Sequence, residues 1–268
     1  MNTEAMMSSP TEATEPYRDT YGAIAFEGLR NTRDLGGLPA GEHHILPRLL
    51  LRSGMLAPAT DADLTRLGEV YDVRLVIDLR TDVEADRWPD PIEALPNANL
   101  VRLPVFQMPD AHNKEALDKL AELSRDLLAG TGDISSFFLG LYPHIVLGAD
   151  GIAAYRGLFQ ALLSLDEGAA LWHCSAGKDR CGMASVLVEA ALGVPWHLVE
   201  RDYLATNALL EARSDAKSPF DVGGVDMRYL RAALDAIEEA YGSLEGYLTE
   251  ALGVDGEARA ELRARFTA

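Results

Sequence analysis

A cysteine and an arginine separated by five residues, Cys174 and Arg180, mark the stretch of this sequence best suited to covalent chemistry. They lie in the segment 173–180, His-Cys-Ser-Ala-Gly-Lys-Asp-Arg, between the apolar run 169–172 and the helix-like stretch 182–192. We therefore expect a strand, a tight loop and a helix. A loop at a helix N-terminus directs several unpaired backbone N–H groups into one cavity, which suits a phosphate-sized anion.

The polar groups of this loop could together hydrolyse a phosphoester. A helix N-terminus and a guanidinium group would lower the thiol pKa from its ordinary value of about 8.5, so that Cys174 attacks phosphorus as a thiolate. Arg180 would clamp two phosphoryl oxygens, and water would hydrolyse the resulting phosphocysteine. The charge of the transferred group would be met by Arg180 and the loop N–H groups, without a metal ion. The other expected phosphate-binding residues are Ser175, Ala176, Gly177 and Lys178.

The segment 173–180 resembles the signature of the cysteine-dependent protein tyrosine phosphatases, in particular the bacterial branch with His-Cys-x-x-Gly-Lys-Asp-Arg. The resemblance covers about 26–266 and includes Asp-Tyr-Leu-x-Thr-Asn at 202–207. It implies an α/β protein tyrosine phosphatase-like fold, a central mostly parallel sheet flanked by helices with a helical C-terminal half. It also implies that Arg33 and Asp34, in Asn-x-Arg-Asp-x-Gly-Gly, border the site; a salt-bridged turn is the alternative.

The leaving oxygen needs a proton donor, and a carboxylic acid suits that role. Asp179 is the first choice because the bacterial branch that the motif resembles carries its acid in the loop. It could instead pair with Lys178 or Arg180 and only shape the loop. Asp78 is the runner-up, and Asp90 a remote third.

Asp78 and Arg80 end the apolar run 73–80, which predicts a strand, and ligands of open α/β sheets bind beyond the carboxyl ends of strands. They could instead pair with each other. Asp90 lies in Trp-Pro-Asp-Pro, the spelling of the acid loop of larger tyrosine phosphatases, but far upstream of Cys174. We therefore interpret it as part of an ordinary turn.

Three neighbours of the nucleophile could tune it or the substrate. Lys178 is expected at the rim, where its charge would favour a substrate with more than one phosphate. His173 is expected to orient the loop through hydrogen bonds. Cys181 stands where the family that this sequence resembles usually has Thr or Ser, and a thiol is a weaker donor. Mild oxidation could join Cys181 to Cys174 in a reversible disulfide.

Composition and patterning define the remaining expectations. The formal charge of −18 argues against nucleic-acid or anionic-membrane partners, although it could serve solubility alone. Residues 1–20 are expected to form a disordered tail and 21–268 one catalytic domain, with an amphipathic helix at 111–130 as a possible lid or simply a packed helix. Two cysteines, both near the motif, and no apolar run of about 18 residues favour a cytoplasmic protein without stable membrane insertion. No cofactor motif or metal-ligand cluster is evident in the sequence.

These observations predict a phosphatase with a phosphocysteine intermediate that acts on phosphotyrosine, or on phosphoserine and phosphothreonine, in proteins. A phosphoinositide substrate is the first alternative. A phospho-ligand binding module without turnover is a further alternative, supported by Cys181 and the open identity of the acid. A rhodanese-like sulfurtransferase is another, because it also presents a loop cysteine before a helix.

Overall fold

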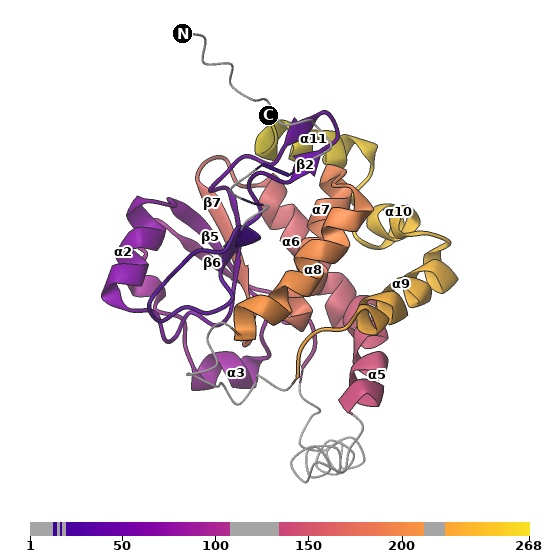
Figure 1. The fold of residues 1–268 in the computed structure, drawn as a ribbon, viewed down its shortest axis with the longest axis horizontal. Helices are drawn as coiled ribbons and strands as arrows, with labels where there is room; N and C mark the ends of the chain where they lie inside the picture. Colours follow the sequence, from indigo (N-terminus) through magenta and orange to yellow (C-terminus); the bar gives the residue numbers. More distant parts are fainter. Residues whose placement is uncertain (1–12, 15–16, 18–19, 108–133, 212–222) are drawn as a thin grey trace.

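A five-stranded sheet forms the centre of the molecule (Figure 1). The structure is a computed structural model that describes residues 13–14, 17, 20–107, 134–211 and 223–268. The strand order is β1, β4, β7, β5, β6, and only the β1–β4 pair is antiparallel, which confirms the expected mostly parallel sheet. The strands are β1 (Arg33–Asp34), β4 (Leu50–Ser53), β7 (Ala169–His173), β5 (Val73–Asp78) and β6 (Asn99–Arg102), and a separate hairpin joins β2 (Pro39–Ala40) to β3 (His43–His44).

Alternate residues of the central strands enter two different cores. In β7, Ala170 and Trp172 pack into the larger core, whereas Ala169 and Leu171 pack into the smaller one. This alternation follows from the two-residue period of a strand. Because β7 is buried on both faces, its entire sequence is apolar up to the terminal His173.

Helices cover both faces of the sheet, as expected (Figure 1). The smaller core lies beneath α2, whose Leu64 and Leu67 pack on it. The larger core holds the C-terminal helices, which confirms the helical C-terminal half. In chain order the helices are α2 (Asp61–Glu69), α3 (Asp82–Arg87), the 3-10 turn η1 (Ile92–Ala94), α5 (Ile134–Leu147), α6 (Ala149–Leu163), α7 (Asp179–Leu192), α8 (Trp196–Glu211), α9 (Met227–Tyr241), α10 (Leu244–Gly246), the π-helical turn η2 (Tyr247–Ala251) and α11 (Gly256–Phe266).

The expected tail contains residues that belong to the core. Ala13 and Tyr17 are each only 2% exposed, and the Tyr17 hydroxyl donates to Asp202 at 2.6 Å. Within that segment, the described side chains of Ala13 and Tyr17 gain apolar burial, and Tyr17 also gains a hydrogen bond. The lid expected at 111–130 lies outside the described residues.

In the described part of the chain, none of the helices combines the length and the apolar composition that a membrane span requires. The apolar helices α5 and α6 would reach such a length only as a pair, and they meet at an angle of 57°.

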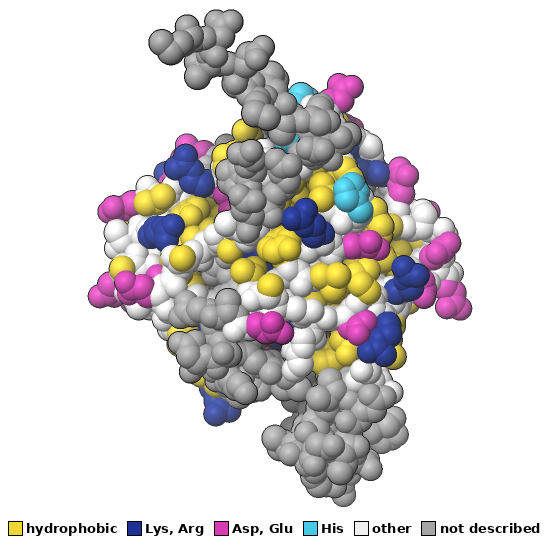
Figure 2. All heavy atoms as spheres, in the orientation of Figure 1, with side chains coloured by type: hydrophobic (Ala, Val, Ile, Leu, Met, Phe, Trp, Pro, Cys, Tyr) yellow, Lys and Arg dark blue, Asp and Glu magenta, His cyan; other side chains and the backbone are white. Residues whose placement is uncertain are grey.

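On the face drawn in Figure 2, the lysine and arginine side chains are scattered among acidic, apolar and neutral groups.

Candidate active site

The segment 173–180, here called the signature loop, joins the central strand β7 to the N-terminus of α7, as the sequence predicts. Its tightest point is Gly177, which has a φ of +66°. A Cβ atom at this position would lie 2.7 Å from the backbone nitrogen of Gly54, which follows β4. Glycine is therefore required here for both its conformation and its size.

Residues outside the signature loop donate hydrogen bonds to its backbone carbonyls. Asn31 Nδ2 and Arg52 Nη2 donate to the Gly177 carbonyl at 2.8 and 2.9 Å, and the Met55 N–H donates to the Ser175 carbonyl at 3.1 Å. By contrast, the loop N–H groups from Ser175 to Gly177 and those of Asp179 and Arg180 donate to no described residue. Such a row of free donors at a helix N-terminus is suited to an anion.

Cys174 is buried at the start of this loop, 2% exposed, beside Cys181. Burial alone would raise the pKa of Cys174, but the Cys181 thiol and backbone N–H and the charge of Arg180 lower it to about 5. Burial and the neighbouring Cys174 sulfur hold the pKa of Cys181 well above its ordinary value. The lowered pKa favours the thiolate form of Cys174, and Cys181 stays a thiol whose Sγ lies beside the Cys174 sulfur and 3.6 Å from the Ser53 carbonyl.

Arg180 forms a bidentate ion pair with Glu84 of α3. Its Nη1 and Nη2 donate to Glu84 Oε2 and Oε1 at 2.6 and 2.9 Å, and the Ser175 hydroxyl donates to Glu84 Oε1. Burial alone would raise the pKa of Glu84, but Arg180, Ser175 and the Thr81 N–H lower it to about 2. The carboxylate therefore stays ionised and fixes the guanidinium plane.

Glu84 is not identifiable from the sequence as a partner of Arg180, because ninety-six positions separate the two residues. One local signal was available. Thr81 and Glu84 form a capping box at the start of α3, with the Thr81 hydroxyl and N–H both hydrogen-bonded to the Glu84 segment. That pattern predicts a helix directly after the β5 strand, whose end lies beside the signature loop.

Asp179 lies at the first position of α7, where the helix dipole favours a carboxylate. Its side chain is 18% exposed, and its Oδ1 accepts a hydrogen bond from the Tyr142 hydroxyl at 2.9 Å. Its Oδ2 lies 3.6 Å from Lys178 Nζ. The expected pairing with Lys178 therefore exists as a contact, but it leaves the carboxyl group partly accessible.

Lys178 does not lie at the rim, contrary to the sequence-based expectation. Its side chain is only 2% exposed, and its Nζ donates to the Gly223 carbonyl at 3.2 Å. The ammonium also lies 4.4 Å from the centre of the Phe138 ring. Phe138 belongs to α5, a helix that the sequence analysis did not predict.

His173, Asp78, Arg80 and Asp90 form one buried cluster beneath the loop. Arg80 pairs with Asp78 at 2.8 Å and with Asp90 at 2.8 Å, and His173 Nε2 lies 3.1 Å from Asp90 Oδ2. Burial alone would raise the pKa of Asp90, but His173 and Arg80 lower it. Asp78 and Arg80 thus pair with each other, the alternative given for them, while the Trp-Pro-Asp turn contacts the signature.

This cluster also brings three potential metal ligands together, since atoms of Asp78, Asp90 and His173 lie within 4.8 Å of one another. The fixed guanidinium of Arg80 already donates to both carboxylates. A divalent cation would face that positive charge at close range, so these residues fit a salt-bridge cluster better than a metal site.

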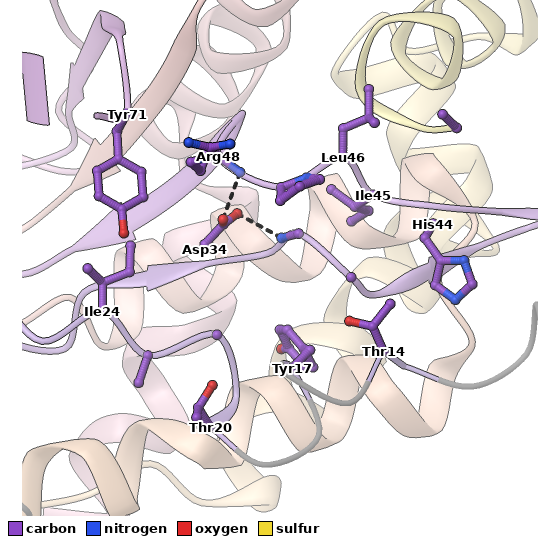
Figure 3. A pocket seen from close by; sticks show the side chains of 16 residues that line it. Thr14, Tyr17, Thr20, Ile24, Asp34, His44, Ile45, Leu46, Arg48 and Tyr71 are labelled. Atoms are coloured by element: carbon purple, nitrogen blue, oxygen red, sulfur yellow. Dashed lines mark hydrogen bonds between the residues drawn. The ribbon is translucent and has the colours of Figure 1, made fainter. Parts of the chain in front are cut away.

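Arg33 and Asp34 are adjacent in the sequence, but their side chains lie in different parts of the structure. Arg33 is fully buried behind the loop, where it donates to Asp202, which also pairs with Arg52. It therefore supports the loop indirectly. Figure 3 shows Asp34 in a separate pocket, accepting from the N–H groups of Gly36 and Arg48 at 2.8 and 2.7 Å. No residue of the signature loop lines that pocket, so Asp34 does not border the site.

The sequence model of the tyrosine phosphatase family matches residues 24–268. A Cupriavidus necator protein that carries a tyrosine-protein phosphatase name is 32% identical over 260 residues, covering 91% of this chain and 88% of that protein. A tyrosine-protein phosphatase of Nostoc commune is 28% identical over 233 residues, covering 81% and 73%. The triple specificity protein phosphatase PtpB of Mycobacterium tuberculosis is 34% identical over 122 residues, covering 37% and 44%.

A solved structure from Neisseria meningitidis overlaps 66% of this chain and 93% of its own, with 19% identity and a TM-score of 0.31, too low to support an argument. The family match and the Cupriavidus relative, by contrast, span almost the whole chain. The chain belongs to the tyrosine phosphatase family.

Proposed function

We propose that this protein hydrolyses phosphate monoesters of tyrosine in proteins through a phosphocysteine intermediate on Cys174. The observation that carries the proposal is the lowered pKa of Cys174, about 5, in a loop where the N–H groups of 175–177, Asp179 and Arg180 donate to no described residue. At neutral pH such a sulfur is a thiolate, the form that attacks phosphorus.

The first step forms the Cys174–phosphorus bond and breaks the bond from phosphorus to the leaving oxygen. The loop N–H groups and Arg180, oriented by Glu84, meet the charge of the transferred oxygens. Asp179 gives its proton to the leaving oxygen. In the second step, water attacks phosphorus, its proton passes to Asp179, and the sulfur leaves as a thiolate.

Asp179 is the acid that the described carboxyl groups favour. Asp78, Asp90 and Glu84 each form an ion pair with an arginine, and each is buried or nearly so. For Glu84 and Asp90 this pairing lowers the pKa and favours the ionised form, which has no proton to give, and the Asp78 side chain is 1% exposed in its pair with Arg80. Asp179 is partly accessible and contacts a tyrosine hydroxyl and, more loosely, an ammonium group.

The burial of Lys178 bears on the substrate class. A free ammonium at the rim was the main local reason to expect a substrate with several phosphates, but the Lys178 ammonium is covered, donates to the Gly223 carbonyl and lies 3.6 Å from the Asp179 carboxyl group. We therefore place phosphotyrosine proteins before phosphoinositides. Phosphoserine, phosphothreonine and phosphoinositide substrates are included in the assay that follows.

A panel assay tests the proposal with phosphotyrosine, phosphoserine and phosphothreonine peptides and phosphoinositide vesicles. We expect turnover of the phosphotyrosine peptide, and Cys174→Ser should abolish turnover while phosphopeptide binding persists. Turnover of vesicles alone would reassign the substrate class. Binding without turnover by the wild-type protein would favour a binding module, and activity on thiosulfate a sulfurtransferase.

A further inference from the structure

Two buried tyrosines connect the proposed acid to helices outside the signature loop. Tyr142 of α5 donates to Asp179 Oδ1 at 2.9 Å, and Tyr203 of α8 donates to the Tyr142 hydroxyl at 2.7 Å. The tyrosines are 0% and 1% exposed, and their rings meet nearly edge to face, with an interplanar angle of 85°. Neither residue belongs to the signature.

The direction of the hydrogen bonds that join Tyr203, Tyr142 and Asp179 follows from which oxygen atoms carry a proton. With the acid proton of Asp179 on Oδ2, its Oδ1 can only accept, so the single hydroxyl proton of Tyr142 points to Oδ1. The Tyr142 oxygen can then accept the proton of Tyr203. Burial raises the pKa of both tyrosines, and the charge of Asp179 raises it further, so both remain protonated donors. Hydrogen bonds in such a series strengthen one another.

The two oxygens of Asp179 consequently differ. Oδ1 is held by Tyr142, whereas Oδ2 accepts no hydrogen bond from a described residue and has only the Lys178 ammonium 3.6 Å away. A hydrogen bond to one oxygen limits rotation of the carboxyl group and leaves the other oxygen to exchange a proton.

We propose that Tyr142, supported by Tyr203, is a positioning residue that holds Asp179 Oδ1, so that Asp179 Oδ2 delivers the proton to the leaving oxygen. The proton on Oδ2 moves to that oxygen as its bond to phosphorus breaks, and the attacking water later returns a proton to Oδ2. This inference rests on the proposed role of Asp179 as the general acid.

The test measures kcat/KM for aryl phosphates whose leaving groups range from acidic to weakly acidic phenols, with wild type, Tyr142→Phe, Tyr203→Phe and Asp179→Asn. A poorly placed acid matters most for a weakly acidic phenol, which leaves badly without a proton. We expect Tyr142→Phe to lose about tenfold on that substrate and much less on the acidic one, since one hydrogen bond to a charged group is lost. Tyr203→Phe should lose less, in the same pattern.

Tyr247→Phe is the matched control, because Tyr247 is also fully buried and its hydroxyl donates only to the Val146 carbonyl, at 2.6 Å. Its dependence on the leaving group should equal that of wild type. Added to Asp179→Asn, Tyr142→Phe should cause no further change in that dependence, because the two residues would act as one unit.

Two failures are distinguishable. If Asp179→Asn gives a steep dependence on the leaving group while Tyr142→Phe and Tyr203→Phe keep the wild-type dependence, the positioning role is wrong and the acid assignment stands. If Asp179→Asn itself keeps the wild-type dependence, the acid assignment is wrong. Should Tyr142→Phe fail to fold, Tyr203→Phe decides alone, because it removes the hydrogen bond that supports Tyr142, and a wild-type dependence on the leaving group would then overturn the positioning role.

Discussion

The carboxylate of Glu84 accepts hydrogen bonds from both terminal nitrogens of Arg180, at 2.6 and 2.9 Å, and thereby joins α3 to the signature loop. The Ser175 hydroxyl donates to the same carboxylate. A guanidinium group has five N–H donors, so the pair leaves others for a phosphoryl group. Glu84 therefore fixes the plane of the arginine before substrate arrives.

Replacing Glu84 with glutamine should lower kcat/KM by roughly tenfold to a hundredfold, because a misplaced clamp loses orientation in the transition state. Gln keeps the shape but cannot accept two charge-assisted hydrogen bonds from Arg180. Steady-state kinetics on an aryl phosphate checks this. Asp86→Asn, on the same helix with a side chain 78% exposed, is the control. Equal activity of Glu84→Gln and wild type would show that Arg180 is oriented without Glu84.

The second prediction concerns pH. Cys181→Ala removes the thiol that donates to the Cys174 sulfur, one of the contacts that lower the pKa of Cys174 to about 5. The pKa should rise by roughly one unit, as expected for the loss of one hydrogen bond to a charged group. The rate of alkylation by iodoacetamide, followed from pH 4 to pH 8, reports the thiolate directly.

Cys181→Ser is the matched control for this experiment, because the hydroxyl restores a donor at the same position. Its alkylation midpoint should lie at or below that of wild type. The same variant should also hydrolyse the phosphocysteine faster, since a hydroxyl is a better donor than a thiol. An unchanged midpoint in Cys181→Ala would mean that Arg180 and the backbone N–H of Cys181 suffice to hold the thiolate.

The strand, loop and helix around Cys174 were predictable because they depend on neighbouring residues: an apolar run, a glycine and an uninterrupted helical stretch. The residues that contact the signature loop from neighbouring parts of the sheet were not predictable in this way. Glu84 and Asp90 reach the loop because β5 lies beside β7, with Asp78 in register with His173. Distance along the sequence gave no measure of that proximity, and it led us to interpret Asp90 as an ordinary turn residue.

The burial of Lys178 was missed for a different reason. It depends on Phe138 of α5, and α5 contains Pro143, which removes a backbone donor and makes a continuous helix unexpected from sequence. Tyr142, the residue before that proline, contacts Asp179. Pro143 alone thus made α5, the helix that carries Phe138 and Tyr142, hard to predict from the sequence.

A third prediction separates Asp90 from the acid role. Asp90→Asn should keep the wild-type dependence of kcat/KM on the leaving group, because its carboxyl is 2% exposed and paired with Arg80 and His173. The variant should nevertheless lose about 2 to 4 kcal/mol of unfolding free energy at neutral pH, since Arg80 loses part of its buried partner. Urea unfolding and the leaving-group series measure the two effects.

The stability loss in Asp90→Asn should depend on pH. Folding lowers the pKa of Asp90, so its ionised form stabilises the fold above the ordinary aspartate pKa of about 3.9, and this contribution is lost as the pH falls below that value. The difference between wild type and variant should therefore shrink in acid. A constant difference would mean that shape, rather than charge, is responsible. A loss of activity confined to weakly acidic leaving groups would instead restore Asp90 as the acid.

The last prediction concerns oxidation by hydrogen peroxide. The Cys174 thiolate attacks one peroxide oxygen, which gives a sulfenic acid and hydroxide, and the Cys181 thiol then attacks the sulfenic sulfur, so that the disulfide forms and water leaves. Both cysteines are free in the structure, and their thiols contact each other. Burial and the Cys174 thiolate raise the pKa of Cys181. Oxidation removes that negative charge, which makes Cys181 easier to ionise at the moment when it must attack.

Brief peroxide treatment should therefore inactivate the wild-type protein reversibly, with activity restored by a thiol reductant and a linked Cys174–Cys181 peptide found by mass spectrometry. Cys181→Ser lacks the resolving sulfur, so it should proceed to the irreversible sulfinic acid at Cys174 under the same treatment. Sulfinic acid in the wild-type protein, without a linked peptide, would contradict the prediction. That result would leave Cys181 with a single role, as the thiol that donates to the nucleophile.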